Sequence, residues 1–579
     1  MVYNRNGKGG DILKINDVEK ITGLTNKAIR LYEGKGLINI SRDTNGYRNY
    51  SDKDVEILKT IKQLRSIGAS ISDIKLYSFG VISLDELLEK RKNEILKESG
   101  KNSEIYLICE RLANEKSIGE SSNIEDFTEK EEVIGTYGAV SVGIDIGTTT
   151  ISAVIYDIDN KKQLDAYSVP HNSYVYSDVY FEQSVPVIIE KAKKLFYHII
   201  DSYKGIVSIG ITGQMHGIVY VNENGKAVSN LINWQDKRAD QTLKCGKSVC
   251  EEIFDITNEH ISTGYGIATH YYNMKNDSVP ENATGICSIM DLFAMDICGT
   301  NEVLTHTSVA ASFGMFDIEK GEFMREKLSL LGIDTDILPS VTGKSTIIGE
   351  CRGIPVSVPI GDNQASFLGS VDDNSGTLLV NIGTGSQVSA VTDYKCVQGD
   401  IEIRPLIDGK FIICGSALCG GFAYSMLEEF FRSYTVSAGL QEESQYDTIN
   451  RLAKESYNKG ENGLSVDVSF FGKRSDPNVR GSIKNIDRQS FTPSSLVLGV
   501  LKGMCNELYD LYNLFNERKI RMVASGGAIK RNEVLRNLLR DCFGMTVKVN
   551  TVEEEAATGA ALFSAHAIDR LRYSNGFYA

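Results

Sequence analysis

The sequence contains one tryptophan, nine prolines and no apolar run of about 18 residues, so it predicts no membrane-spanning helix. Its first ten residues lack the apolar core of a signal peptide. Eleven cysteines are scattered along the chain without a C-x-x-C pair, which argues against a zinc site and a disulfide framework. We therefore expect a cytoplasmic protein whose thiols are reduced.

What the chain does have is length and an ordinary globular composition. Its 579 residues are 42% hydrophobic and 24% charged, which predicts several domains with ample cores. The net charge of −14 argues against a protein that is wholly a nucleic-acid binder. Residues 1–80, however, carry 14 Lys and Arg against 9 Asp and Glu, or about +5 (14 − 9). A basic N-terminal module on an acidic body indicates a DNA-reading domain attached to an enzyme-like one.

Residues 13–77 predict a winged helix-turn-helix. Helical patterns at 14–19 and 26–32 flank a turn in which Thr25 is placed to cap the second helix. The dipeptide Asn45-Gly46 predicts the hairpin turn of a wing. The residues that we expect to contact bases or phosphates lie on the second helix and the wing: Asn26, Lys27, Arg30, Tyr32, Arg48 and Tyr50.

This region resembles the MerR family of transcription regulators. The resemblance rests on Ile29-Arg30-Leu31-Tyr32-Glu33, Gly36-Leu37-Ile38, Gly46-Tyr47-Arg48-Asn49-Tyr50 and Asp54-Val55-Glu56-Ile57-Leu58, in that order. The family usually has an aromatic residue where Leu31 stands. The resemblance implies that residues 11–80 bind double-stranded operator DNA and that a helical segment over 83–116, interrupted near Gly100, makes a homodimer. The alternative is a helix packed against its own domain. Residues 117–138 are rich in Ser, Gly and Glu and predict a flexible acidic linker.

Two similar hairpin patterns organise the remainder. Residues 140–157 alternate β-branched residues around a Gly-Thr-Thr-Thr turn, and residues 378–392 repeat the pattern with Asn381 in the place of Asp145. The copies lie 236 residues apart (381 − 145). A duplication on this scale predicts two similar lobes that close on a nucleotide, with turn N–H groups from Gly147 to Thr149 facing phosphates.

Further polar clusters follow apolar segments. They are Thr212-Gly213-Gln214-Met215-His216-Gly217, Asn233-Trp234-Gln235-Asp236-Lys237-Arg238 and Gly361-Asp362-Asn363-Gln364. Polar clusters at strand ends in a duplicated α/β chain indicate a cleft.

Together these motifs resemble the FGGY family of carbohydrate kinases over about residues 139–570. The shared motifs are residues 145–149, 213–217, 361–363, 381–385 and Ser525-Gly526-Gly527-Ala528. Trp234-Gln235-Asp236-Lys237-Arg238 and Thr263-Gly264-Tyr265-Gly266 are most similar to members that act on sedoheptulose, and then to those that act on xylulose. The resemblance implies an α/β, two-lobed actin-like ATPase fold of the ribonuclease H-like type, with lobes at 139–370 and 371–570.

The family's roles carry over as expectations. Asp362 would be the general base, and Asp145 would hold Mg²⁺ beside ATP. The residues expected to face the sugar are Met215, His216, Asp236, Arg238, Asp362 and Asn363. Those expected at ATP are Gly147, Thr148, Thr149, Gly383, Thr384, Gly421, Gly526, Gly527 and Asn532, with helix packing as the alternative for Gly420-Gly421.

Two positions depart from the family. Ser152 stands where members usually have Lys or Arg, and Phe471-Gly472-Lys473-Arg474 stands where many have Gly-Glu-Arg. The leading hypothesis is an ATP-dependent ketose kinase attached to a DNA-binding head. The rival is a transcription regulator whose kinase fold senses sugar or nucleotide with little turnover. A third hypothesis is a head that only dimerises.

Overall fold

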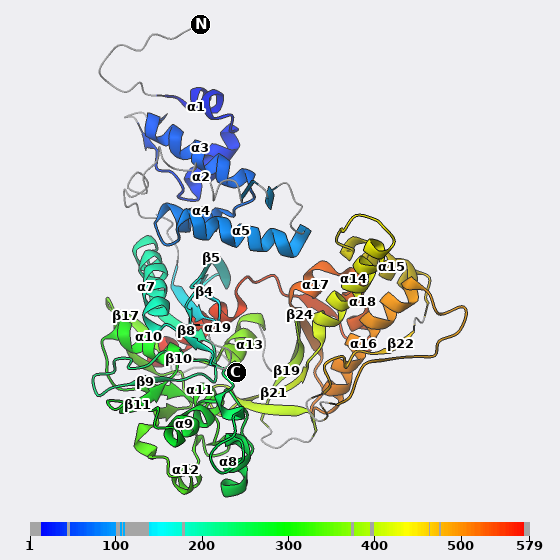
Figure 1. The fold of residues 1–579 in the computed structure, drawn as a ribbon. Coiled ribbons are helices and arrows are strands. Elements are labelled where there is room, and N and C mark those ends of the chain that lie inside the picture. The colour runs from blue at the N-terminus through cyan, green and yellow to red at the C-terminus, as the bar shows by residue number, and fades with distance from the viewer. Residues whose placement is uncertain are drawn as a thin grey trace. The chain divides into compact units, whose positions relative to one another are not determined.

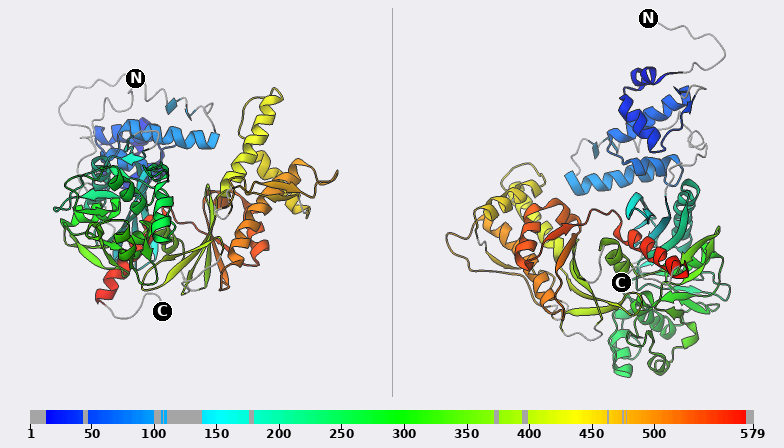
Figure 2. Two further views of the ribbon diagram at one scale, coloured as in Figure 1. Left: turned by 60° about the horizontal axis from the view of Figure 1, so that its bottom comes forward. Right: turned by 180° about the vertical axis from the view of Figure 1, so that it is seen from behind.

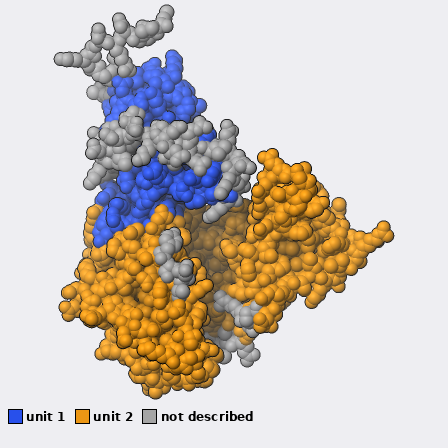
Figure 3. Space-filling view, viewed as in Figure 1, with its two compact units in different colours: residues 1–138, 165–171, 190–205 blue, residues 139–164, 172–189, 206–579 orange. Residues whose placement is uncertain are grey.

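The computed structural model describes residues 13–42, 47–99, 105–106, 108–109, 138–175, 180–371, 376–393, 399–461, 464–473, 476 and 478–572. The chain forms two compact units, coloured separately in Figure 3. Unit 1 comprises residues 1–138, 165–171 and 190–205, and unit 2 comprises the remainder. The predicted linker lies outside the described residues except for Gly138.

Residues 13–99 of unit 1, here called the head, contain five helices and a two-stranded wing (Figure 1). The elements are α1 (Ile15–Thr22), α2 (Asn26–Gly34), β1 (Ser41–Arg42), β2 (Arg48–Asn49), α3 (Asp52–Ser66), α4 (Ile71–Ser78) and α5 (Leu84–Ser99). Thr25 caps α2 by accepting a hydrogen bond from the Ala28 N–H at 3.2 Å, as predicted. The strands of the wing are antiparallel, and its predicted Asn45-Gly46 turn lies outside the described residues.

The predicted dimerisation segment is helical over α5, while Gly100 and most of the residues beyond it lie outside the described part. In α5 the apolar residues Leu87, Leu88 and Ile95 are buried in a single chain. Their burial therefore needs no second copy of the protein. This agrees with the alternative prediction, a helix that packs against its own domain.

The first predicted hairpin is β3 (Val140–Ile146) and β4 (Thr150–Asp157), paired antiparallel. It lies in a six-stranded sheet of order β16-β17-β8-β3-β4-β5. The other strands are β5 (Lys162–Pro170), β8 (Ile206–Gly213), β16 (Ile347–Cys351) and β17 (Ile354–Ser357). Strands β3 and β8 are parallel, so the ends of both reach the same edge of the sheet.

The second predicted hairpin is β18 (Thr377–Ile382) and β19 (Ser386–Thr392), in a second six-stranded sheet of order β20-β21-β19-β18-β24-β25. Its other strands are β20 (Ile401–Pro405), β21 (Phe411–Ala417), β24 (Arg521–Ser525) and β25 (Val547–Val549). Strand β18 is parallel to β24, just as β3 is parallel to β8. The predicted repeat is therefore confirmed: each six-stranded sheet contains one hairpin whose first strand has a parallel neighbour.

Helices α13 (Asp362–Ser370) and α19 (Glu555–Arg572) pack tightly beside the first sheet (Figures 1 and 2). A Cβ atom at Gly143 of β3 or Gly210 of β8 would collide with α19 carbonyl groups, and one at Gly559 would collide with the Ala365 carbonyl of α13. Only glycine allows this approach. This close packing holds the start of α13, and therefore Asp362, against the ends of the strands.

The remaining elements surround these layers. Those before α13 are β6 (Tyr174–Val175), β7 (Glu182–Gln183), α7 (Val185–Ser202), β9 (Val219–Val221), β10 (Leu231–Ile232), α8 (Val249–Thr257), α9 (Gly266–Lys275), β11 (Gly285–Cys287), α10 (Ile289–Cys298), β12 (Leu304–His306), α11 (Thr307–Ser312), β13 (Phe316–Asp317), β14 (Glu322–Phe323), α12 (Arg325–Leu330) and β15 (Ser340–Thr342), with 3₁₀ turns η2 (Arg238–Asp240) and η3 (Thr335–Ile337). Those after β21 are α14 (Gly420–Ser437), α15 (Tyr446–Asn458), β22 (Ser465–Asp467), β23 (Ser482–Lys484), α16 (Pro493–Asn513), α17 (Gly527–Arg531) and α18 (Glu533–Phe543). Among the described residues no helix has the length and apolar character needed to cross a membrane.

Candidate functional site

Two carboxylates meet at the edge of the first sheet. Asp145 is the penultimate residue of β3, and Asp362 is the first residue of α13, following the helix cap Gly361. Both side chains are partly exposed. The N–H of Gly361 donates to the Ser308 hydroxyl at 3.0 Å, which anchors the turn that presents Asp362.

Burial raises the pKa of both carboxyl groups, and neighbouring negative charges raise that of Asp145 further. The pKa of Asp145 rises to about 8, through burial first and then the charges of Asp362 and Glu554. Burial raises the pKa of Asp362 to about 6, against the lowering effects of the Asn363 N–H and of the Arg404 guanidinium. With a pKa of about 6, the Asp362 carboxylate is a stronger base than an ordinary one and is still ionised at pH 7. Perturbed carboxyl groups at a strand-to-helix junction are typical of a catalytic site.

The carboxylate oxygens at this site fit a divalent metal ion that is held partly by the protein and partly by a bound substrate. Mg²⁺ prefers oxygen ligands and commonly uses one or two carboxylates together with substrate phosphates. Within the described ranges no group of three or more His, Cys, Asp or Glu side chains is placed to hold a metal. Asp145 is thus suited to a metal that nucleotide phosphates also ligate. A cation there would offset the burial and the repulsion that raise the pKa of Asp145.

The turn between β3 and β4 is held from three sides. The Trp234 indole N–H donates to the Thr148 hydroxyl at 3.0 Å, and the Gln183 amide donates to the Thr148 carbonyl at 2.8 Å. Gln214 donates to the Gly147 carbonyl at 3.3 Å. The Gly147 N–H, which we expected at a phosphate, instead closes the turn on the Thr150 carbonyl at 2.9 Å. Thr149 is exposed at the tip.

The equivalent turn between β18 and β19 exposes Gly383 and Thr384. The N–H of Gly421 donates to the Gly383 carbonyl at 2.8 Å, and a Cβ atom at Gly421 would collide with that same carbonyl. Gly420 approaches the backbone of Gly385 in the same way. Close packing of α14 under the turn therefore explains both glycines, which was the alternative prediction for this pair.

The Ser525-Gly526-Gly527 segment follows β24. Gly526 has φ +102° and lies against the Ile382 backbone, so no side chain fits there. Gly527 is exposed, and nothing lies within 4 Å of the position that a Cβ would take. The space beside Gly527 is therefore open, as the binding of a flat nucleotide base against this segment requires. Asn532 is buried: its side chain caps α18 and donates to Asn450 Oδ1 at 3.0 Å, so its contacts lie within the chain.

Met215 lies next to Gly361, the residue that precedes Asp362, and His216 follows Met215 in the chain. The Met215 sulfur is so close to Gly361 that a Cβ there would clash with it. His216 has φ +72°, and its ring stacks on Tyr265 with centroids 4.4 Å apart. His216 Nδ1 lies 2.8 Å from the Ser312 carbonyl oxygen. Because a carbonyl only accepts, His216 Nδ1 carries a proton and donates to it.

Asn363 follows Asp362 and contacts the second sheet. Its amide donates to Gln387 Oε1 of β19 at 3.2 Å, and the Cys414 thiol lies 3.8 Å from its Oδ1. These contacts join the start of α13 to β19 and β21. Asn363 is thus held beside Asp362 by residues of the opposite lobe.

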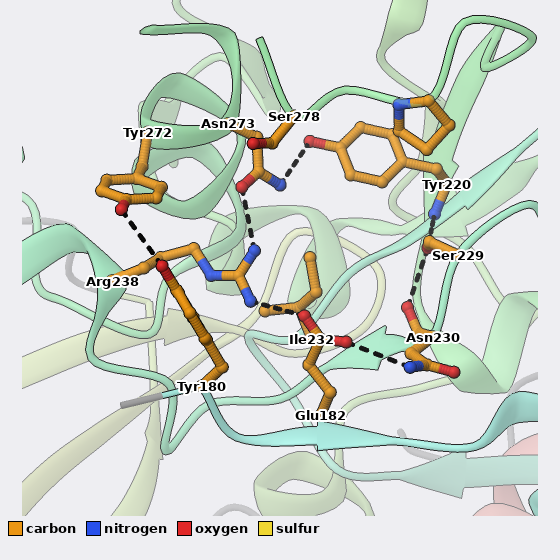
Figure 4. Close-up of a pocket in the computed structure, with 11 residues that line it drawn as sticks. Tyr180, Glu182, Tyr220, Ser229, Asn230, Ile232, Arg238, Tyr272, Asn273 and Ser278 are labelled. Atoms are coloured by element: carbon orange, nitrogen blue, oxygen red, sulfur yellow. Dashed lines mark hydrogen bonds and ion pairs between the residues drawn. The ribbon is translucent and has the colours of Figure 1, made fainter. Parts of the chain in front are cut away.

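Asp236 and Arg238, expected near the sugar, form a buried ion pair with 2.7 Å between Arg238 Nε and Asp236 Oδ1. Arg238 also contacts Glu182 Oε1 at 2.7 Å and Asn273 Oδ1 at 2.9 Å. Arg238 lines a cavity of about 310 Å³ (Figure 4). No other residue expected at the sugar lines this cavity, so the structure does not bring Arg238 together with Asp362 there.

In the head, Lys27 and Arg30 are exposed on α2. Asn26 Nδ2 donates to Glu19 Oε2 at 2.9 Å, which ties α2 to α1. Arg48 of the wing is ion-paired with Glu33 at 2.6 Å. These placements leave Lys27 and Arg30 as the accessible cations of the predicted DNA-reading set.

Tyr32 and Tyr50 were also expected at DNA, but they are only 7% and 1% exposed. Both side chains pack in the core of the head. An aromatic residue in a helix or wing pattern can fill the core or contact a ligand at the surface, and only the packing distinguishes the two roles.

The sequence analysis missed several supporting residues. Gln183, Ser312, Gln387 and Arg404 lie in segments without a motif, and each reaches the site from another element. No local signal marks such residues, because their role depends on contacts between distant segments.

Two equivalent six-stranded sheets, each with a hairpin turn at one edge and acidic or amide groups beside it, define the two-lobed actin-like class of ATPase folds. Residues 140–379 match the N-terminal domain of the FGGY family of carbohydrate kinases, and residues 378–568 match its C-terminal domain. Residues 13–78 match the MerR HTH family regulatory protein. The chain therefore belongs to the FGGY family of carbohydrate kinases and carries a MerR-type helix-turn-helix at its N-terminal side.

Known relatives differ in their substrates. The chain is 24% identical over 474 residues to sedoheptulokinase of Mus musculus, covering 73% of this chain and 96% of the relative. It is 24% identical over 454 residues to xylulose kinase of Staphylococcus xylosus, covering 74% and 90%. The crystal structure of gluconate kinase from Lactobacillus acidophilus matches with a TM-score of 0.63 at 18% identity, over 75% of this chain and 90% of that one.

Proposed function

We propose that the protein transfers the γ-phosphate of ATP to a hydroxyl group of a ketose, either sedoheptulose or a pentulose such as xylulose. The observation that carries the proposal is Asp362, a partly exposed carboxylate with a pKa of about 6 at the start of α13 beside Asp145. Similarity to sedoheptulokinase and xylulose kinase supports a ketose as the acceptor.

In this mechanism Asp362 accepts the proton of the sugar hydroxyl as its oxygen attacks the γ-phosphorus. A bond forms between that oxygen and phosphorus, and the bond from phosphorus to the β,γ-bridging oxygen breaks, giving ADP and a sugar phosphate. Mg²⁺ beside Asp145 would neutralise charge on the phosphates. His216 and Asn363 would face the sugar and orient its hydroxyl groups.

The nucleotide would lie between the two hairpin turns, with Thr148 and Thr149 on one side and Gly383 and Thr384 on the other. Gly527 would leave room for adenine, because a side chain at this position would occupy the open space beside α17.

The head would bind double-stranded operator DNA through α2, with Lys27 and Arg30 as its exposed cations. The fusion would then link sugar metabolism to transcription. This part of the proposal rests on the MerR match and on the basic character of residues 1–80.

One assay tests the enzymatic proposal. The purified protein is incubated with ATP, Mg²⁺ and, in separate reactions, sedoheptulose, xylulose, ribulose, gluconate and glycerol, and ADP formation is followed. A ketose should stimulate ADP formation in the native protein and not in Asp362→Asn. Stimulation by gluconate or glycerol alone would contradict the ketose assignment.

A second candidate, a sugar sensor with little turnover, is favoured by Ser152. This residue pairs with Asp145 across β3 and β4 and is only 2% exposed, so no cation stands where the resembling family has one. Calorimetric binding of a ketose with a non-hydrolysable ATP analogue, without ADP formation from ATP, would support the sensor over the kinase.

A further inference from the structure

Unit 1 contains two segments that come from the kinase part of the sequence. These are residues 165–171, which include the end of β5, and residues 190–205, which include most of α7. Both contact helices α4 and α5 of the head. We call the face formed by Lys75 of α4, Phe79 directly after α4, and Glu86 and Lys90 of α5 the α4–α5 surface.

Lys75 lies at the centre of these contacts. Its side chain is 6% exposed, and its Nζ is 3.0 Å from Asp165 Oδ2 and 3.4 Å from the Tyr167 hydroxyl. The Tyr203 hydroxyl donates to the same Asp165 oxygen at 2.8 Å, and the hydroxyls of Tyr167 and Tyr203 are 3.2 Å apart. Burial, with the contacts to Tyr167 and Asp165, raises the pKa of Tyr203, so this hydroxyl stays protonated as a donor.

Further contacts flank Lys75. Lys90 is ion-paired with Asp73 at 2.6 Å and also donates to the Ser168 carbonyl at 2.9 Å. Glu86 is ion-paired with Lys191 of α7. The α4–α5 surface thus reaches both segments through charged groups as well as through Lys75.

An aromatic contact closes the same face. The Phe79 ring lies 4.2 Å from the His198 ring of α7, centroid to centroid. Burial and the Lys75 charge lower the pKa of His198 to about 4, so the His198 ring is neutral at pH 7. A neutral ring packs on Phe79 without adding a second positive charge beside Lys75.

A buried lysine costs several kcal/mol unless an anion accompanies it, and removal of one partner leaves the other charge uncompensated. The anion here is supplied 90 residues away in sequence. The head therefore contains a buried cation whose partner is encoded beyond the predicted 117–138 linker. An independently folding head attached by a slack linker would not be expected to carry such a residue.

We propose that the α4–α5 surface is an intramolecular docking surface for residues 165–171 and 190–205, with Lys75 as its anchoring cation. The head and these two segments then open and close as one cooperative unit, so the linker is not the only connection between the two halves of the sequence. The claim concerns unit 1 alone and does not depend on sugar, nucleotide or DNA binding.

Hydrogen exchange of the full chain, followed by mass spectrometry without ligands, tests the proposal. Lys75→Met should raise the exchange rates of amides in 165–171 and 190–205 by about tenfold or more, because loss of the anchor opens a cooperative unit. The matched control is Lys59→Met, which removes the exposed ion pair of Lys59 with Glu56 on α3 and should leave these rates unchanged.

In the double variant Lys75→Met/Asp165→Asn, the increase in exchange rate should be smaller than the product of the increases in the two single variants. The reason is that neither buried charge is left without its partner. Glu86→Gln is a milder variant, at a partly exposed pair, and should raise exchange in 190–205 by about threefold. It keeps the test valid if Lys75→Met does not fold. Unchanged exchange rates in Lys75→Met would overturn the proposal; if Lys75→Met is unfolded, unchanged rates in Glu86→Gln would do so. The proposal would also fail if the rate increase in the double variant equalled the product of the increases in Lys75→Met and Asp165→Asn.

Discussion

At the scale of single residues, the proposed general base is the carboxylate of Asp362 at the start of α13. Asp362→Asn keeps the shape of the side chain and removes the base. We expect phosphorylation to fall by about 10²-fold or more, with sugar affinity changed far less. Initial rates and calorimetric sugar binding measure the two effects separately. A variant that keeps most of its turnover would mean that another group takes the proton.

The pKa of Asp362 predicts a pH dependence of activity. A base must be ionised, so kcat/KM should fall about tenfold per pH unit below pH 6, the value to which burial raises this pKa. A pH–rate profile of the native enzyme measures it. A profile that stays flat down to pH 5 would contradict a base with this pKa.

The same group predicts that Asp362→Asn is more stable than the native protein. The folded pKa of about 6 lies above the unfolded value of about 3.9, so the folded state binds the proton more tightly. Stability is therefore lost as the pH rises from about 4 through 6. Without metal, the variant should melt a few degrees higher at pH 7, and the two melting temperatures should converge near pH 4. Equal melting temperatures at pH 7 would show that the native carboxylate is not destabilising.

Gly527 offers a test of the nucleotide site. Because no atom lies within 4 Å of its missing Cβ, Gly527→Val should fold normally and obstruct only a ligand. We expect a higher KM for ATP with an unchanged preference among sugars. Gly34→Val is the matched control, since Gly34 is an equally open glycine at the end of α2. A shift in sugar preference in Gly527→Val would place the sugar, not ATP, at α17.

At the scale of elements, α2 and the wing act as one surface because Glu33 of α2 holds Arg42 and Arg48 of the wing. Arg30→Ala should weaken DNA binding and reduce the slope of log affinity against log salt by about one, with kinase activity unchanged. Arg48→Ala should also weaken binding. Titrations of labelled operator fragments at several salt concentrations measure both.

Glu33→Gln separates two roles of Arg48. If Arg48 binds phosphate, loss of the Glu33 charge leaves DNA binding equal or stronger. If Arg48 serves to hold the wing, Glu33→Gln weakens binding as Arg48→Ala does. Undiminished binding in both Arg30→Ala and Arg48→Ala would refute a DNA-reading role for α2 and the wing.

At the scale of the whole molecule, one chain carries a sugar kinase fold and a DNA-binding fold. If a ketose with an ATP analogue changes operator affinity, operator must change ligand affinity by the same factor, because the coupling is reciprocal. We expect such a change in the native protein and in Asp362→Asn, which binds without turnover. The Lys75→Met/Asp165→Asn variant should lose it, because its docking surface is weakened. Equal operator affinities with and without ligands would mean that ligand binding and DNA binding are not coupled.

The sequence by itself determined the parts of this protein that depend on local pattern. Alternating β-branched residues around Gly-Thr turns specified both hairpins, and their repetition specified two equivalent sheets. Cap and turn residues such as Thr25 specified the helix-turn-helix. Local hydrogen bonds and the alternation of residues along a strand depend only on residues close together in sequence. The amino-acid sequence alone therefore reveals them.

Only the tertiary structure decided what the polar side chains do. Arg238 and Asn532 carry plausible motifs, yet their hydrogen bonds are satisfied within the chain. Tyr50 belongs to the core, and Lys75, which no motif marked, is buried against Asp165. Burial and charge pairing depend on residues far apart in sequence. For this reason the sequence predicted the class of chemistry, and the packing decided which side chains are accessible to perform it.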